Sequence, residues 1–314
     1  MPEWLIERGI GETRAALVAD GAILRAGLEL DDDRPRVGAV VAGRLGGKLP
    51  GGGVRVVLDG GEEVVLARPP AGVTEGAALR VEITRAALPE PGRAKPARGV
   101  ATDAPLRPGA TLADRIADTG HPWRALRAHE PDLLEQAGWS ELLDEAVSGE
   151  IAFAGGGLRL SPTPAMTLFD VDGPAPLDAL AIRAANAVAA AILRMDIGGS
   201  IGIDFPTLAG KAPRQAVAEA IDAALPQPFE RTTVNGFGFL QIVRPRPRAS
   251  LPELLRADPV AAAARAALRT LERTPPGASS RHRLPPAVHA LLASRPDWLA
   301  ELARRTGVTP LLEH

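Results

Sequence analysis

In the first third of the chain, short apolar runs alternate with breaks made of glycine, aspartate and proline. Asp20-Gly21, between the apolar runs 13–18 and 22–30, is the strongest short signal of a β-hairpin. The chain is therefore predicted to open with a β-meander. Further apolar runs follow at 37–45, 54–58, 64–67 and 78–84, with glycine-rich or proline-rich breaks between them. Strands this short and closely spaced predict a small barrel over residues 36–88.

The middle and the end of the chain change pattern. Residues 89–109 carry five prolines and no apolar period, which predicts a linker or an exposed loop. Helical spacing begins at Thr111 and appears again over 140–147, before strand-like alternation returns at Ile151. Beyond Leu251 the pattern is helical, so a small helical unit is predicted to end the chain.

The most informative stretch contains two apolar runs that each end in aspartate. Met166-Thr-Leu-Phe-Asp170-Val-Asp172 is the first, and Ile201-Gly-Ile-Asp204 is the second. Residues two apart in a strand share a face, so Asp170 and Asp172 are predicted to point the same way. The segment 178–195 has helical spacing, which predicts a crossover helix between two parallel strands. A ligand site is then expected at the carboxyl ends of those strands.

Carboxylates at neighbouring strand ends predict a metal site. An ionised carboxylate beside a buried strand is costly unless it is paired or bound to a cation. Asp170 and Asp204 are therefore candidate ligands of Mg²⁺, with Mn²⁺ as a substitute. Each aspartate taken alone has another interpretation, as a turn former or a helix N-cap. The two motifs together favour the metal site.

Composition excludes several classes of protein. The chain has 314 residues, and its 46% hydrophobic content is ordinary for a globular protein. Its formal net charge of −2 argues against a uniformly basic surface. The absence of cysteine excludes disulfides, thiol catalysis and cysteine-based zinc sites. No apolar run approaches the length of a membrane span and no leader pattern is present, so we predict a cytoplasmic protein without a membrane partner.

Two groups of basic residues are candidates for contacts with phosphate. Arg244, Arg246 and Arg248 alternate with prolines, an extended pattern that predicts three guanidinium groups on one side. Lys211 and Arg214 follow Asp204 closely in the sequence. Both groups have another interpretation: the arginines as a solvated edge, and the other two as surface charge at a helix N-terminus.

Five motifs in order resemble the catalytic half of the ribonuclease E/G family. They are Gly155-Gly-Gly-Leu-Arg-Leu, Thr163-Pro-Ala-Met, Phe169-Asp-Val-Asp-Gly, Ile197-Gly-Gly-Ser-Ile-Gly-Ile-Asp-Phe and Asn235-Gly-Phe-Gly-Phe-Leu-Gln-Ile-Val-Arg. The resemblance implies a mixed α/β fold: a ribonuclease-H-like part interrupted by an S1/OB-type β-barrel, then a deoxyribonuclease-like catalytic part. The implied parts are 1–35 with 110–160, the barrel at 36–88, the linker at 89–109, the catalytic part at 161–250 and the helical unit at 251–314.

The resemblance also implies an activity. Family members are Mg²⁺-dependent endoribonucleases that cut single-stranded RNA with a metal-activated water and leave a 5′ phosphate. The family's two metal-binding aspartates fall on Asp170 and Asp204, and Asp172 stands where the family has a supporting asparagine. Single-stranded RNA is accordingly the expected partner, Mg²⁺ the expected cofactor, and zinc is not expected.

Several departures from the family pattern suggest another function. Pro164 replaces a glutamate, Gly236 replaces an arginine, and Gly51 to Gly53 lie where exposed aromatic residues of an S1 barrel would stack bases. Without cysteines, any homo-oligomer would not be held by zinc. The alternative is a catalytically degenerate RNA-binding protein of the same fold. A phosphoesterase that acts on a small nucleotide is a third, weaker alternative.

Overall fold

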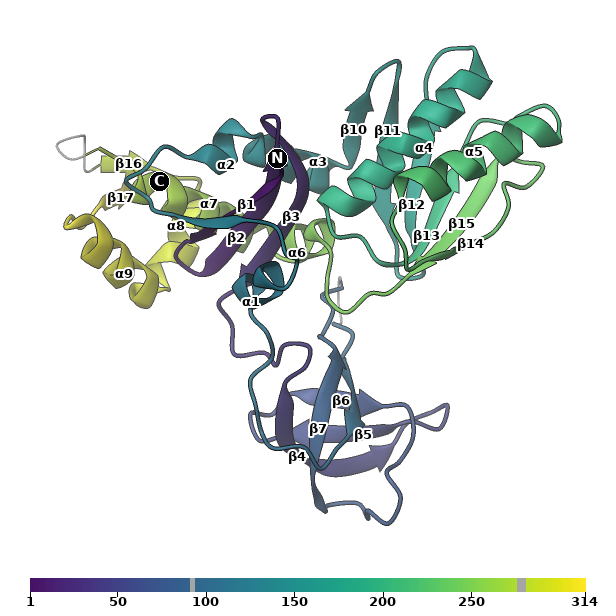
Figure 1. Ribbon diagram of the computed structural model, residues 1–314. Helices are drawn as coiled ribbons and strands as arrows, with labels where there is room; N and C mark the ends of the chain where they lie inside the picture. The colour runs from purple at the N-terminus through teal and green to yellow at the C-terminus, as the bar shows by residue number, and fades with distance from the viewer. Residues whose placement is uncertain (91–93, 276–280) are drawn as a thin grey trace. The chain divides into compact units, whose positions relative to one another are not determined.

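The computed structural model describes residues 1–90, 94–275 and 281–314 and shows a mixed α/β protein with three sheets and a closed barrel (Figure 1). The chain divides into two compact units. The first unit contains Met1–Asp32, Leu112–Leu142 and Leu255–His314, and the second contains Asp33–Thr111 and Leu143–Leu254. None of the helices in these described ranges is long and apolar enough to span a bilayer.

The first unit is built on a four-stranded sheet in the order β3-β2-β1-β9. Its strands are β1 (Glu3–Arg8), β2 (Glu12–Ala19), β3 (Ala22–Leu30) and β9 (Trp123–Leu126). The predicted hairpin is confirmed: β2 and β3 pair antiparallel on either side of Asp20 and Gly21, which have φ of 50° and 76°. Positive φ at both central residues is typical of a type I′ turn, whose twist matches that of the flanking strands. Asp-Gly is a preferred pair for this turn because both residues can adopt positive φ.

Helices from the middle and from the C-terminal end of the chain complete this unit. They are α1 (Leu112–Ala117), α2 (Leu133–Gln136), α7 (Pro259–Glu272), α8 (Pro286–Ala293) and α9 (Pro296–Thr306), with a short parallel pair of β16 (Arg281–Arg283) and β17 (Leu311–Glu313). The predicted helical C-terminal unit does not form a core of its own, because Ile10 is buried in one cluster with Leu268, Leu292 and Trp298.

A buried network of charges joins β1 and β2 to α7. Glu7 and Arg14 are cross-strand partners with side chains 4% and 1% exposed, and Arg14 Nη2 donates to Glu7 at 2.8 Å. Glu12, two residues from Arg14 on the same face, accepts from Arg265 Nε at 2.9 Å and pairs with Arg269. The arginines of α7 lie four residues apart, so they form one stripe on the helix. Buried charges are tolerated here because each has a charged partner.

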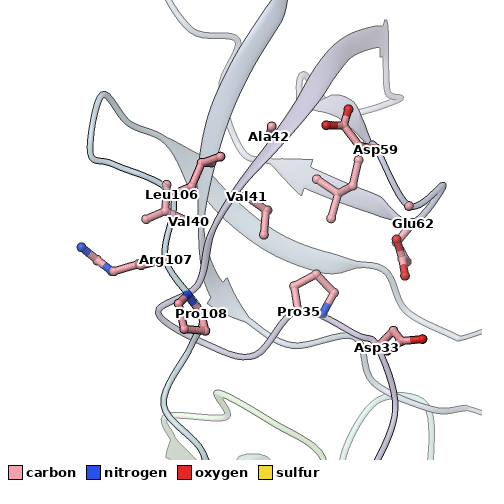
Figure 2. Close-up of a pocket in the computed structure, with 12 residues that line it drawn as sticks. Asp33, Pro35, Val40, Val41, Ala42, Asp59, Glu62, Leu106, Arg107 and Pro108 are labelled. Atoms are coloured by element: carbon pink, nitrogen blue, oxygen red, sulfur yellow. The ribbon is translucent and has the colours of Figure 1, made fainter.

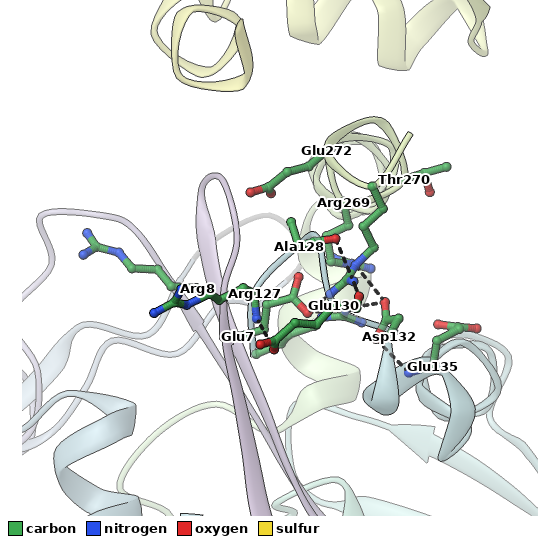
Figure 3. A network of polar contacts seen from close by, with 12 residues as sticks. Glu7, Arg8, Arg127, Ala128, Glu130, Asp132, Glu135, Arg269, Thr270 and Glu272 are labelled. Atoms are coloured by element: carbon green, nitrogen blue, oxygen red, sulfur yellow. Dashed lines mark hydrogen bonds and ion pairs between the residues drawn. The ribbon is translucent and has the colours of Figure 1, made fainter. Parts of the chain in front are cut away.

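Asp132 ties the segment before α2 to this network (Figure 3). Its carboxylate accepts from Arg14 Nη2 at 2.6 Å and from the amide of Glu135 at 3.0 Å, and it pairs with Arg273. Burial alone would raise the pKa of the Asp132 carboxyl, but the hydrogen bond and charge of Arg14, with the Glu135 amide and Arg273, outweigh burial and hold that pKa below its usual range.

The low pKa of Asp132 predicts a pH dependence of stability. A carboxyl whose pKa is depressed on folding stabilises the protein above its unfolded pKa of about 3.9, and this contribution disappears as the pH falls through the folded value. Asp132→Asn keeps the shape but loses the charge, so we expect it to cost about 2 kcal/mol at pH 7. We expect the difference from wild type to shrink below about pH 4.

Tryptophan fluorescence during urea unfolding is the measurement. All four tryptophans of the chain lie in the first unit, so their emission follows this unit alone: Trp4, Trp123, Trp139 and Trp298. A gap between Asp132→Asn and wild type that stays constant from pH 7 to pH 3 would contradict this account of the network.

A closed barrel forms the first part of the second unit. It joins β4 (Val40–Lys48), β5 (Val54–Leu58), β6 (Glu63–Leu66), β7 (Ala78–Arg85) and β8 (Ala97–Ala101) in the order β4-β5-β6-β8-β7. Its core includes Leu45, Val56, Val64 and Val81, all buried. The barrel predicted from the spacing of apolar runs is present and is consistent with an S1/OB-like barrel.

The structure places the closing strand inside the segment that was predicted as a linker over 89–109, of which residues 91–93 lie outside the described residues. The strand β8 pairs with both β6 and β7. Its inward position Gly99 is tightly enclosed, because a Cβ there would lie 2.4 Å from Val81 Cγ1 and 2.8 Å from the Glu82 carbonyl oxygen. A strand that must present glycine and alanine inward has no apolar period, so the sequence pattern does not reveal it.

The second part of this unit is a six-stranded sheet in the order β10-β11-β12-β13-β15-β14. Its strands are β10 (Glu150–Phe153), β11 (Gly156–Pro162), β12 (Thr167–Asp172), β13 (Gly199–Asp204), β14 (Glu230–Arg231) and β15 (Phe239–Arg244). The hairpin β10–β11 belongs to this sheet, although the predicted boundary at residue 160 assigned most of it to the preceding part.

Helices α4 (Leu177–Arg194) and α5 (Lys211–Ala224) lie over one face of this sheet (Figure 1). The crossover helix predicted over 178–195 is confirmed, and the strands that it joins, β12 and β13, are parallel. The chain passes between the two units after Asp32, after Thr111, within α3 (Trp139–Ser148) and within α6 (Leu251–Ala257). Fully buried side chains alternate along the strands beneath the helices, among them Phe169, Ile203 and Leu240.

Candidate metal and nucleic-acid site

Strand alternation places the three aspartates on one face of the six-stranded sheet. Along β12, Phe169 and Val171 are buried towards the helices, whereas Asp170 and Asp172 are exposed. Along β13, Ile203 is buried and the last residue, Asp204, is exposed. The aspartates therefore lie on the face opposite α4 and α5, which we call the open face.

The parallel register brings two of these aspartates side by side. Asp170 and Asp204 are direct partners across β12 and β13, at the usual strand spacing of about 4.8 Å. Like charges directly opposite each other on neighbouring strands are destabilising. A cation bound between the two carboxylates would offset this repulsion. The sequence predicted only that both aspartates lie at neighbouring strand ends, and the structure adds the register that makes them direct partners.

We call Asp170 and Asp204 the acidic pair. The residues directly opposite them on the neighbouring strands extend this pair into a row across the sheet. Arg159 of β11 lies opposite Asp170, and Glu150 of β10 lies opposite Arg159. Arg159 Nε donates to Glu150 at 3.0 Å, and its side chain is 67% exposed. Phe239 of β15 lies opposite Asp204 at the other end of the row. No local sequence pattern marks Arg159 or Glu150, because their place beside Asp170 depends on the register of β10, β11 and β12.

Asp172 lies apart from the acidic pair. It is the last residue of β12 and faces Gly157 of β11. With Asp170, Arg159 and Glu150 it lines a shallow pocket of about 360 Å³. Asp172 can therefore add negative charge to the approach to Asp170.

The donor set at the acidic pair fits a hard divalent cation. Across the described ranges, no cluster of three or more histidine or carboxylate side chains is arranged to hold a metal ion. Asp170 and Asp204 offer two carboxylates that are open to water. Mg²⁺ keeps several waters and is commonly held by one or two carboxylates together with phosphate oxygens of the substrate, a pattern that two exposed acids in register fit.

The three arginines predicted to face RNA together each have a protein partner. Arg244 Nη1 donates to the Ile197 carbonyl oxygen at 3.1 Å. Arg246 pairs with Glu253, and Arg248 Nε donates to Asp196 at 2.7 Å. These bonds hold the segment after β15 against the turn before β13 and against α6. A contact of these three arginines with RNA stays a prediction.

The other two basic candidates lie at the start of α5, after the loop that leaves Asp204. Lys211 is the first residue of the helix and is exposed. Arg214 Nε donates to the Gly210 carbonyl oxygen at 2.8 Å. Its Nη1 is 3.5 Å from the position that a Cβ on Gly236 would occupy, so the guanidinium group flanks the turn before β15.

The barrel carries a larger pocket whose chemistry does not suit RNA. The pocket has a volume of about 560 Å³ and combines an apolar lining, including Val40 and Leu106, with the carboxylates Asp33, Asp59 and Glu62 (Figure 2). The one arginine in its lining, Arg107, donates to Glu82 at 3.0 Å. Carboxylates repel a polyanion, so a nucleic acid is expected to avoid this side of the barrel.

Comparison with known proteins adds no assignment. No protein-family model matches the chain, and no curated protein matches it. The resemblance to the ribonuclease E/G family therefore stays a prediction.

Proposed function

We propose that this protein is a divalent-metal-dependent endoribonuclease that cuts single-stranded RNA and leaves a 5′ phosphate. The observation that carries the proposal is the register of Asp170 and Asp204. Two exposed carboxylates are direct neighbours on parallel strands, on a face that the helices of the sheet leave open. The ribonuclease E/G-like motifs around both aspartates supply the reaction type.

The roles of the side chains follow from their places in the row. Asp170 and Asp204 would hold a Mg²⁺ ion, and neither acid has to move a proton. When bound, the ion supplies positive charge against the reacting phosphate and a water of lowered pKa. Arg159 brings a guanidinium group to the row beside Asp170, where it can bind phosphate oxygens in place of Glu150.

A non-catalytic RNA-binding protein of the same fold is the second candidate. The observation in its favour is that the acidic pair has only two carboxylates in register, while Pro164 and Gly236 replace charged residues of the family pattern. Such a protein would retain RNA through its basic side chains, and retention would weaken steeply with added salt.

Cleavage of an end-labelled single-stranded RNA tests the proposal. We expect internal cuts in Mg²⁺ whose downstream fragments carry a 5′ phosphate, no cuts after EDTA, and recovery when Mn²⁺ is added. The chemistry of the new ends separates this reaction from a metal-independent contaminant, which leaves 5′ hydroxyls. Equal cleavage in EDTA would overturn the proposal, and salt-sensitive retention of RNA without cleavage would favour the second candidate.

A further inference from the structure

Two phenylalanines lie beside the acidic pair in a chain that is poor in aromatic residues. The chain has six phenylalanines, four tryptophans and no tyrosine. All four tryptophans lie in the first unit. Within the second unit, which contains the open face, phenylalanine is therefore the aromatic residue available for stacking. Phe239 lies opposite Asp204 in β15, and Phe237 belongs to the turn that precedes this strand.

The Phe239 side chain extends over Gly202 of β13 on the open face. It is the direct cross-strand partner of Asp204 and is half-buried. A Cβ on the neighbouring Gly202 would lie 2.6 Å from Phe239 Cζ and 2.8 Å from Leu168 Cδ2. Glycine at this position therefore lets the ring lie across β13 and meet Leu168. The result is an apolar surface directly beside the two carboxylates.

Phe237 is held out from the same end of the sheet by a rigid turn. Its side chain is 85% exposed. Asn235 Oδ1 accepts from the amides of Phe237 and Phe239 at 2.9 and 3.0 Å, which fixes the turn in an Asx-type conformation. Gly238 has φ of 95° and packs so closely that a Cβ would lie 2.2 Å from the Phe205 carbonyl oxygen. The backbone that presents the ring is therefore well ordered, although the ring itself is not buried.

A cationic side chain borders this turn. The Arg214 guanidinium group lies beside Gly236, immediately before Phe237. Exposed rings next to a cation are the surface that proteins use for single-stranded nucleic acid, since the bases stack on the rings and the cation attracts the backbone. Bases inside a duplex are already stacked and cannot reach such rings.

We propose that Phe237 and Phe239 form a stacking platform for the nucleobase next to the phosphate that contacts the cation bound by Asp170 and Asp204. This inference rests on the proposed function and deepens it, because it makes the site selective for unpaired RNA. Each stacked base is expected to change binding on the order of 10-fold to 100-fold.

Fluorescence of RNA that contains 2-aminopurine is the test, because stacking quenches this base whether or not the RNA is cut. The probes are single-stranded oligoribonucleotides with 2-aminopurine at one position each, mixed with the intact protein in Ca²⁺. We expect quenching at one or two positions. Phe237→Ala and Phe239→Leu should each weaken binding of that probe about 10-fold and remove the quenching, while Phe237→Trp should retain it. Leucine preserves the packing on Gly202, and circular dichroism checks that each variant is folded.

Trp123→Ala is the matched control, because Trp123 is also exposed, at 52%, but belongs to the first unit. It should leave the quenching unchanged. Cleavage of the unlabelled RNA in Mg²⁺ is measured in parallel. Cleavage with quenching that is absent or unaffected by the phenylalanine variants overturns this inference alone. Quenching that depends on both phenylalanines without cleavage overturns the proposed activity alone, and a protein that neither binds nor cuts RNA overturns both.

Discussion

Asp170→Asn and Asp204→Asn are each expected to lower kcat for RNA cleavage on the order of 10³-fold, the size of effect that follows when charge stabilisation of a transition state is removed. Asparagine has the shape of aspartate but lacks the negative charge that holds a divalent cation. Both side chains are exposed, Asp170 within β12 and Asp204 at the end of β13, so neither substitution opens a cavity. The loss should therefore appear in catalysis, with an unfolding midpoint no lower than that of the wild type, because each variant also removes the repulsion between the two carboxylates.

Asp178→Asn is the matched control for these two variants. It makes the same chemical change at an exposed aspartate in the first turn of α4, the helix on the covered face of the sheet. We expect its cleavage rate to equal that of the wild type. Cleavage that persists at the wild-type rate in both Asp170→Asn and Asp204→Asn would exclude the acidic pair from the reaction.

Glu12→Ala is expected to destabilise the first unit by about 3–5 kcal/mol, the cost of leaving a buried charge without its partner. Glu12 is 3% exposed and is shared by Arg265 and Arg269, which are 6% and 11% exposed. Burial already lowers the pKa of the Arg269 guanidinium, a shift that the charge of Glu12 opposes. Without that carboxylate, two arginines would remain in a poorly hydrated place beside Arg14.

Unfolding in guanidinium chloride, followed by tryptophan emission, measures this loss, because the tryptophans report on the first unit. Glu313→Ala is the matched control, since it breaks an exposed ion pair with Arg281. The Glu313 side chain is 50% exposed and the Arg281 side chain is 69% exposed. Exposed pairs contribute about 0–1 kcal/mol, so the control should unfold close to wild type. A Glu12→Ala variant as stable as the Glu313→Ala variant would show that the buried network does not stabilise this unit.

Local pattern predicted the elements that carry the site. The Asp-Gly turn gave the first hairpin, the spacing of apolar runs gave four barrel strands, and the helical spacing of 178–195 gave the crossover between β12 and β13. Parallel strands joined by one crossover bring their carboxyl ends to the same edge. The sequence pattern therefore predicts that Asp170 and Asp204 lie near each other.

Features that depend on contacts between distant segments could not be predicted in this way. The C-terminal helices share a core with Ile10, and α7 supplies arginines to Glu7 and Glu12 more than two hundred residues earlier. The local sequence around each of these residues does not indicate which distant segment it contacts. The same limit explains why Arg159 was missed and why the bonds of Arg244, Arg246 and Arg248 to protein groups were not foreseen.

Binding of Mn²⁺ to the intact protein tests most directly whether Asp170 and Asp204 act as one cation site. The loss of the free-ion signal in electron paramagnetic resonance gives the dissociation constant without any substrate. We expect one site in the wild type and in Asp178→Asn, and binding at least about 10-fold weaker in Asp170→Asn and in Asp204→Asn, because each loses one of two charged ligands. Equal Mn²⁺ affinity in the wild type and in the double variant would contradict the account.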